Sequence, residues 1–444
     1  MKFMKKLVVV CLISSMVMSQ AVSAEEATAT TAAQPEAPSN WAAWDVQMLS
    51  VYGIGNAQTF TGYKEVVSLE QFKVLHDGLL TSFEVSDELD EDLSELTRGD
   101  VVREFYDIMN EALMLSENEV ITVEEVIKYF VDEKLMNGRT NGDYALDSSI
   151  SNEEMIVFTK RVFDHMTYKL DKDITGTFWT VSDENNTVYL LGSVHATDGS
   201  VYPLNDEIMA GFADSAAIAV EANTLVLSPE DVAYIQQLMM LEEGVTIDQV
   251  ISEEVYTKYE TKAIELGLTA DVYNKLKPWY ASIVLSNAFL ASNNLSGSLG
   301  IDTYFQYLAY GSKPIMEIEG MKYQFDMLNG FNEEQAESML AESLSEDEAS
   351  SELLELIMTN WKSGNIEELN EGLFAEEAVT ESEKEVAEAI WGTRNKHMSE
   401  YIVELLEADT DDNYFVIVGA GHYLNDDGIV AELEALGYVV EQSK

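Results

Sequence analysis

Two histidines follow short apolar stretches of the chain in the same way. In YLLGSVH the apolar run ends at Gly192, and His195 stands three residues later. In FVIVGAGH, Gly419 precedes His422 by the same spacing. A glycine at this point permits a turn that aims the following side chain along the edge of a sheet. Because imidazole serves both as a metal ligand and as an acid–base group near neutral pH, this pair is the first candidate for chemistry.

Glu221 completes the pattern, because it directly follows the apolar run AAIAV. A buried carboxylate needs a partner, and carboxylates with neutral imidazoles form a ligand set for hard to borderline divalent ions. His195, His422 and Glu221 therefore predict a metal site, in which Glu221 is either a third ligand or the base that activates a bound water. A single histidine at a strand end would more often be structural, and the repeated spacing favours the functional interpretation. The other histidines, His76, His165 and His397, stand in amphipathic helical stretches and are expected to be structural or surface residues.

Three further side chains are weaker candidates. Asp302 is either another metal ligand or the cap of the helix TYFQYLAY. Arg394 could steady an oxyanion or a substrate carboxylate, since a guanidinium forks onto either, or could form an ordinary ion pair. Glu319, after the run KPIMEI, could orient a metal-bound histidine from behind.

Such a site requires strands that end near one another. FWTV, the turn SDENN and TVYLLG predict a β-hairpin, and short apolar strands are expected at 216–220, 315–318 and 414–418. Helical periodicity dominates from about 229 to 295. The pattern predicts an α/β or α+β core with a helical insertion. If its strands are parallel neighbours, the histidines emerge together at the carboxyl edge, where ligands bind in open α/β sheets.

The part of the chain before this core divides into three segments. Residues 1–24 have the lysines, apolar stretch and small-residue cleavage site of an export signal. Residues 25–40 are small, polar and Pro-containing, which is typical of a linker. Residues 41–171 show helical periodicity separated by turn-rich segments.

The helical segment resembles S-layer homology repeats. The stretch YFVDEKLMNGRTNGDYALDSSISNEEMIVFTKRV has the helix, Gly-containing turn and polar cap of one repeat, and LTRGDVVREFYDIM and VSLEQFKVLHDGL look like parts of two more. The resemblance implies binding of cell-wall polysaccharide through a Thr-Arg pair, which only Thr97 and Arg98 match. The alternative is a helical domain that packs on the catalytic unit or on another protein.

The core resembles the TraB/GumN family and the related TIKI metalloproteases over residues 176–442, so a domain of 176–444 is expected. Besides the two Gly-x-x-His motifs and Glu221, the resemblance rests on KPWYASIVL, GIDTYFQYLAYGSKPIMEIEG, WKSGNIEEL and TRNKHM, in that order. It implies a hydrolase-like fold and a peptidase that uses a divalent ion such as manganese or cobalt.

Composition limits the partners. The chain has 81 acidic and 25 basic residues, a net charge of −56, which repels phosphate backbones and anionic lipid, so nucleic acid is an improbable partner. Its single cysteine, Cys11, lies in the export signal, so the mature chain would have no disulfide. No later stretch is apolar for about 18 residues, so no integral membrane segment is expected in the mature chain. The chain is expected to be secreted, with wall association as an option.

Three function classes remain open. The first is a secreted metallopeptidase that acts on peptides or exposed protein ends. The second is a metal-independent, esterase-type hydrolase on the same scaffold, because histidines and acids can catalyse hydrolysis without a metal. The third is a protein that binds a peptide signal without cutting it.

Overall fold

The computed structural model describes residues 37–443 apart from 87–88, 90–95, 116–121, 139–142, 346–347 and 375–379. The chain divides into two compact units between Asp173 and Ile174. The expected export signal and all but the end of the expected linker lie outside the described residues. At that end Ser39 donates to the Glu153 carboxylate within the N-terminal unit, and a helix begins at Asn40.

The described part of the N-terminal unit is helical. Its helices are α3 (Asn40–Val51), α4 (Leu69–Phe83), α5 (Arg98–Leu113), α6 (Val123–Asp132) and α7 (Asn152–Lys169). Ser68, Thr97, Thr122 and Ser151 begin α4 to α7 with reciprocal capping boxes, which satisfy backbone N–H groups that a helix start leaves unpaired. The apolar faces of these helices meet in one core that includes Phe72, Phe105 and Phe158.

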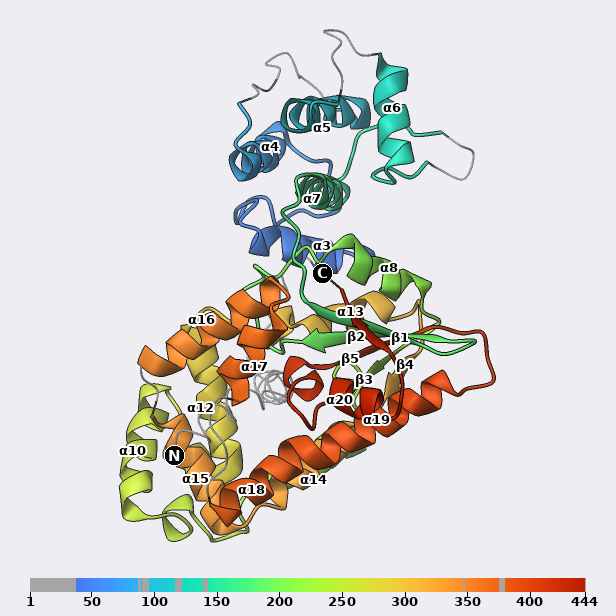
Figure 1. Cartoon of the computed structure of the whole chain (residues 1–444). Helices are drawn as coiled ribbons and strands as arrows, with labels where there is room; N and C mark the ends of the chain where they lie inside the picture. Colours follow the sequence, from blue (N-terminus) through green and yellow to red (C-terminus); the bar gives the residue numbers. More distant parts are fainter. Residues whose placement is uncertain are drawn as a thin grey trace. The chain divides into compact units, whose positions relative to one another are not determined.

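The C-terminal unit is built on a six-stranded mixed sheet (Figure 1). The strands are β1 (Thr177–Ser182), β2 (Thr187–Ser193), β3 (Ala217–Val220), β4 (Ile315–Glu317), β5 (Tyr414–Gly419) and β6 (Val440–Gln442), in the order β4-β3-β5-β2-β1-β6. β1 and β2 form the expected antiparallel hairpin. β2, β5, β3 and β4 run parallel, so their carboxyl ends share one edge.

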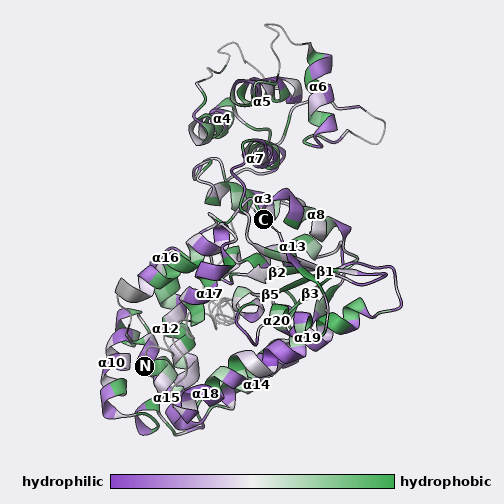
Figure 2. Cartoon of the chain, in the orientation of Figure 1, coloured by the Kyte–Doolittle hydropathy of each residue, from purple (hydrophilic) through white to green (hydrophobic). Residues whose placement is uncertain are grey.

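Helices cover both faces of the sheet. α8 (Asp206–Asp214) and α13 (Ile301–Ala309) lie on one face, and α19 (Thr393–Leu406) and α20 (Ile429–Ala435) lie on the other (Figure 1). Phe305 of α13 packs against Phe415 of β5 with ring centroids 4.9 Å apart, and β3 and β5 carry buried apolar runs. In Figure 2 the strands are mainly hydrophobic, whereas the outer helices mix polar and apolar residues. This pattern is typical of a sheet buried between two helical layers.

The remaining helices lie between the strands in the order of the sequence. Between β3 and β4 lie α9 (Pro229–Met239), α10 (Glu253–Glu265), α11 (Ala270–Tyr273) and α12 (Pro278–Ser292). Between β4 and β5 lie α14 (Met321–Asn329), α15 (Glu333–Ser343), α16 (Glu348–Lys362), α17 (Ile366–Phe374) and α18 (Glu381–Ala387), with one π-helical turn at Glu388–Gly392 before α19. α12 and α15 pack together in a second apolar core. None of the helices among the described residues is long and apolar enough to cross a membrane.

Candidate functional site

The carboxyl edge of the sheet brings three of the sequence-predicted residues together. His195 follows β2, Glu221 follows β3 and His422 follows β5, and these three strands are neighbours. Nε2 of His195 and Nε2 of His422 each lie 3.9 Å from the same oxygen, Oε1 of Glu221. Glu221 and His422 are buried, so the cluster lies in a low-dielectric environment where charges interact strongly.

Glycines make this approach possible. A Cβ on Gly419 would lie 3.1 Å from Nε2 of His195 and 3.4 Å from Oε1 of Glu221, so a side chain there would crowd the cluster. Gly192 is packed more tightly still, and its carbonyl accepts hydrogen bonds from the indole of Trp361 at 2.7 Å and the hydroxyl of Thr177 at 3.1 Å. The two motif glycines therefore serve close packing at the strand ends.

Asp302 lies behind His195. Its Oδ1 is 2.8 Å from Nδ1 of the ring, the nitrogen opposite the one that faces Glu221. Burial alone would lower the pKa of His195, but the Asp302 carboxylate, its hydrogen bond and the Glu221 charge outweigh it and raise the pKa to about 9. In this arrangement the Asp302 carboxylate orients the His195 ring from behind; a further role of Asp302 as a metal ligand stays a prediction. The alternative as a helix cap is wrong, since α13 begins at Ile301 with no side-chain cap.

Asn395 plays the matching part for His422, and the sequence interpretation missed it. Its Oδ1 is 2.7 Å from Nδ1 of His422, and its Nδ2 donates to the carbonyl of Asp427 at 2.9 Å, which sets the orientation of the amide. Nδ1 of His422 is thereby the donor and Nε2 keeps its lone pair. Burial and the Arg394 charge lower the pKa of His422 to about 3, so this imidazole is neutral. Asn395 stands in TRNKHM, one of the quoted landmarks, which is the signal that could have found it.

Glu221 is held in its ionised form by a ring of donors. Oε2 accepts from Arg394 at 2.6 Å and from the amide of Gln324 at 3.0 Å, and Oε1 accepts from the backbone N–H of Gly419 at 2.7 Å. Burial would raise the pKa of Glu221, but Arg394, the two imidazoles and the Gly419 hydrogen bond outweigh it and lower the pKa to about 2. An acid with so low a pKa is a weak base and a good ligand or charge-stabilising group.

Arg394 forms ion pairs within the protein, which was the alternative interpretation of this residue. Its guanidinium is buried and forks onto Glu319 with two contacts of 2.8 Å, in addition to its contact with Glu221. These donors bind protein carboxylates in this arrangement, and a role of Arg394 in binding an oxyanion or a substrate carboxylate stays a prediction. The Glu319 carboxylate contacts Arg394 and Gln324 in this arrangement, and the polar side chains at Nδ1 of the two histidines are Asp302 and Asn395.

The donor chemistry fits a divalent ion. Two imidazoles, each fixed through Nδ1 by a polar partner, direct Nε2 at a carboxylate oxygen, which is the usual support for metal-binding histidines. Because the pKa of His195 is raised to about 9, its Nε2 would release a proton when an ion binds. Ligands about 2.1 Å from one ion lie about 3.4 Å apart, so the 3.9 Å separations are somewhat wide. Accordingly, within the described parts of the chain no three His, Cys, Asp or Glu side chains stand ready to hold an ion. His195 and His422 are the residues that would hold it, with Glu221 as the third.

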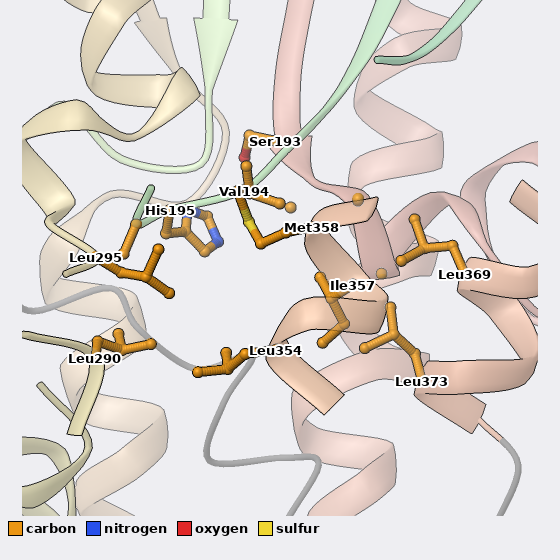
Figure 3. A pocket seen from close by; sticks show the side chains of 14 residues that line it. Ser193, Val194, His195, Leu290, Leu295, Leu354, Ile357, Met358, Leu369 and Leu373 are labelled. Carbon is orange, nitrogen blue, oxygen red and sulfur yellow. The ribbon is translucent and has the colours of Figure 1, made fainter. Parts of the chain in front are cut away.

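A pocket opens beside His195 at the same edge of the sheet (Figure 3). Its volume is about 70 Å³, and Ser193, Val194, His195 and Gly419–Gly421 line its side toward the strands. The opposite walls are apolar side chains of α12, α16 and α17, together with Leu295. A substrate group in this pocket would therefore lie next to the His195 ring.

The remaining candidates lie elsewhere. His397 is on the exposed side of α19, where its Nε2 is 3.1 Å from the carbonyl of Ile318. His76 and His165 belong to the N-terminal unit, and Nε2 of His165 is 2.7 Å from the Tyr129 hydroxyl. Arg98 is the first residue of α5, directly after the capping Thr97.

Comparisons with known proteins bear on the C-terminal unit. Residues 177–442 match the TraB/PrgY/gumN family. Neither the curated proteins nor the solved structures contain a match to the chain. The matched range covers all six strands and the whole His195–Glu221–His422 cluster. It does not extend into residues 41–171, so the resemblance to S-layer homology repeats stays a prediction, as does a specific relation to TIKI metalloproteases.

Proposed function

The chain belongs to the TraB/PrgY/gumN family, and from that premise we propose that its C-terminal unit is a metal-dependent hydrolase that cleaves peptides or exposed protein ends. The observation that carries the proposal is the convergence of His195 and His422 on Glu221, with both Nε2 atoms 3.9 Å from one carboxylate oxygen. Asn395 and Arg394, which support these residues, are buried, and burying polar groups in this way lowers stability unless every partner is in place.

Each residue has a distinct task in the proposed site. A divalent ion such as manganese or cobalt, when bound, supplies a water of lowered pKa and polarises the scissile carbonyl. His422 presents an unprotonated Nε2 because Asn395 holds the proton on Nδ1. Glu221 is kept ionised by Arg394 and Gln324, and its low pKa favours the role of ligand over that of base. Asp302 fixes the ring of His195.

A second candidate, hydrolysis without a metal, is favoured by the Asp302–His195 pair. A carboxylate 2.8 Å from Nδ1 of an imidazole that lines a pocket is the arrangement of an acid–base histidine. In that reaction the His195 Nε2 would exchange a proton with water or with the leaving group. The requirement for a metal separates the two candidates.

Metal analysis and a peptide library test the proposal together. The purified full chain is dialysed against a chelator, reloaded with Mn²⁺ or Co²⁺, and analysed for bound metal by mass spectrometry. Each form is then incubated with a mixed synthetic peptide library, and the products are mapped. We expect cleavage only after reloading, with His195→Ala and His422→Ala each losing cleavage and bound metal.

His397→Ala is the matched control, because it removes an imidazole from the exposed side of α19. It should keep both cleavage and metal. Cleavage that survives the chelator would favour the metal-free candidate, and binding of peptides without any cleavage would favour the peptide-binding alternative. Full activity of both alanine variants would place the chemistry elsewhere in the chain.

We further propose that the chain is secreted and that the N-terminal unit is its route to the cell wall. The proposal rests on the leader pattern of residues 1–24 and on the S-layer-like caps, with Arg98 as the wall-binding candidate. N-terminal sequencing of the exported chain should begin near Glu25. Sedimentation with isolated cell walls should retain the wild type and release Arg98→Ala; equal retention of both would remove Arg98 from the proposal.

A further inference from the structure

The pocket beside His195 is built for an apolar group. Its outer walls are formed by Leu290 of α12, Leu354 and Ile357 of α16, and Leu369 and Leu373 of α17 (Figure 3). All five are branched aliphatic side chains, and Met358 of α16 lines the same pocket. α16 and α17 follow one another in the chain, whereas α12 lies well before them. Burying an aliphatic group here removes apolar surface from water on both partners, which favours binding.

The inner end of the pocket holds one buried hydroxyl. Ser193 is the last residue of β2, lines the pocket and is 3% exposed, and its Oγ has no hydrogen-bond partner among the described residues. A buried hydroxyl without a partner destabilises a protein, so such groups usually bond a water or a ligand. Figure 3 shows Ser193 above the apolar walls, close to His195. The pocket therefore combines aliphatic walls with one polar contact at the strand ends.

The size of the pocket limits what enters. Its volume is about 70 Å³, whereas an apolar cavity that holds benzene measures about 150 Å³. The comparison favours a branched aliphatic side chain over an aromatic ring as the group that enters.

We propose that this pocket is the specificity subsite of the enzyme: it takes the aliphatic side chain, valine- or leucine-sized, of a residue adjoining the scissile bond, while Ser193 hydrogen-bonds the peptide backbone of that residue. The inference rests on the proposed peptidase function and adds the substrate class. A long acyl chain would also pack against the apolar walls, but it has no peptide group that could hydrogen-bond the Ser193 hydroxyl.

Short peptides that differ at one residue test the size limit. Cleavage sites are mapped with the peptide library and metal-loaded chain, and peptides with Ala, Val, Leu, Phe or Trp at each position flanking the cut are then compared by kcat/KM. We expect Leu or Val to exceed Ala by at least about tenfold and to exceed Trp by a similar factor, since each added or missing methylene changes such ratios by about 10- to 200-fold. Leu354→Ala should improve Phe relative to Leu by about tenfold.

Two matched controls accompany these variants. Leu353→Ala removes the same side chain from the same helix at a position outside the pocket lining, and it should leave the preference unchanged. Ser193→Ala should lower kcat/KM for all peptides by about the same factor, roughly five- to tenfold, as expected for one lost hydrogen bond to the backbone. Ser286→Ala is the matched control, because it removes a hydroxyl that donates to the Ser282 carbonyl within α12, and it should leave kcat/KM unchanged.

Direct binding separates this inference from the proposed function. Calorimetric titration of the full chain with N-acetyl-L-leucinamide and N-acetyl-L-phenylalaninamide requires no turnover. The subsite is supported, even if no peptide is cleaved, when the wild type binds the leucine compound more tightly than the phenylalanine compound. Ser193→Ala should lose this binding, and Leu354→Ala should reduce the difference in affinity between the two compounds. Cleavage without any preference for aliphatic residues, or preferences that Leu354→Ala leaves unchanged, overturns it. Failure of both cleavage and binding overturns the subsite and the peptidase together.

Discussion

Replacing Arg394 by methionine would leave two carboxylates inside the protein without their cation. The guanidinium contacts Glu221 at 2.6 Å and Glu319 at two points of 2.8 Å, its own side chain is 2% exposed, and that of Glu319 has no exposed surface. Methionine keeps most of the volume, so the loss of charge dominates over any cavity. Removing one partner of a buried ion pair typically lowers the free energy of unfolding by about 3–5 kcal/mol. We expect a loss of that order at pH 7.

The loss should depend on pH. In the wild type the pKa of Glu221 is lowered to about 2, so its stabilising contribution is present above its ordinary pKa and is lost as the pH falls toward about 2. Without Arg394 the largest of the effects that oppose burial is gone, so the pKa of Glu221 rises relative to the wild type, and the carboxyl takes up a proton at a higher pH and escapes part of the penalty there. The difference between the two proteins should therefore be smaller at pH 4 than at pH 7.

Urea unfolding after removal of metal measures both effects. Tryptophan fluorescence suits the assay, because Trp179, Trp279, Trp361 and Trp391 lie in the C-terminal unit. Lys258→Met is the matched control, since Lys258 forms an exposed ion pair with Glu254 in α10 and exposed pairs contribute little to stability. A loss below about 1 kcal/mol for Arg394→Met at pH 7, or an equal loss at pH 4 and pH 7, would refute the reasoning.

The remaining predictions concern the support of the histidines and the boundary between the units. Asn395→Leu removes the hydrogen-bond acceptor behind His422 and should weaken Mn²⁺ binding by about 10- to 100-fold in a calorimetric titration. Unchanged affinity would show that Asn395 does not support His422 as a metal ligand. In the metal-free chain the pKa of His195 is raised to about 9, so its protonated ring stabilises the fold below the ordinary pKa of 6.5. This stabilisation is lost as the pH rises through 9. Asp302→Asn should therefore flatten this part of the melting temperature when it is plotted against pH. Gly300→Ala should lower peptide cleavage by at least about tenfold with an unchanged circular dichroism spectrum, because its Cβ would lie 2.3 Å from the His195 carbonyl oxygen and displace that residue; unchanged cleavage would show that the backbone adapts. A chain that begins at Ile174 should be soluble and should unfold cooperatively, and aggregation of this fragment would show that the two units need one another.

The strand-end pattern in the sequence was sufficient for much of the fold. The hairpin of β1 and β2, the strands before Glu221 and His422 and the helical region before the core follow from local periodicity and turn residues, which depend only on neighbours in the chain. The family match over residues 177–442 agrees with the resemblance inferred from the Gly-x-x-His motifs. What the three site residues do there stays a proposal.

The partners of the site residues could not be predicted in the same way. Asp302 in a Gly-Ile-Asp stretch is compatible with a helix cap, and only the approach of α13 to the end of β2 turned its carboxylate to His195. Glu319 and Gln324 are near in sequence, yet their contacts with Arg394 and Glu221 depend on how α14 and α19 meet at the sheet edge.

The sequence by itself determined that Glu221 and the two histidines follow the ends of strands, because apolar runs and glycine turns are local properties of each segment. Only the tertiary structure decided which nitrogen of each histidine faces Glu221, that Arg394 is bound within the protein, and that leucines of α12, α16 and α17 surround one pocket. These features bring together segments that are distant in the sequence, such as Arg394 and Glu221. Their geometry follows from how whole helices pack on the sheet. No local pattern encodes a distance between two such segments.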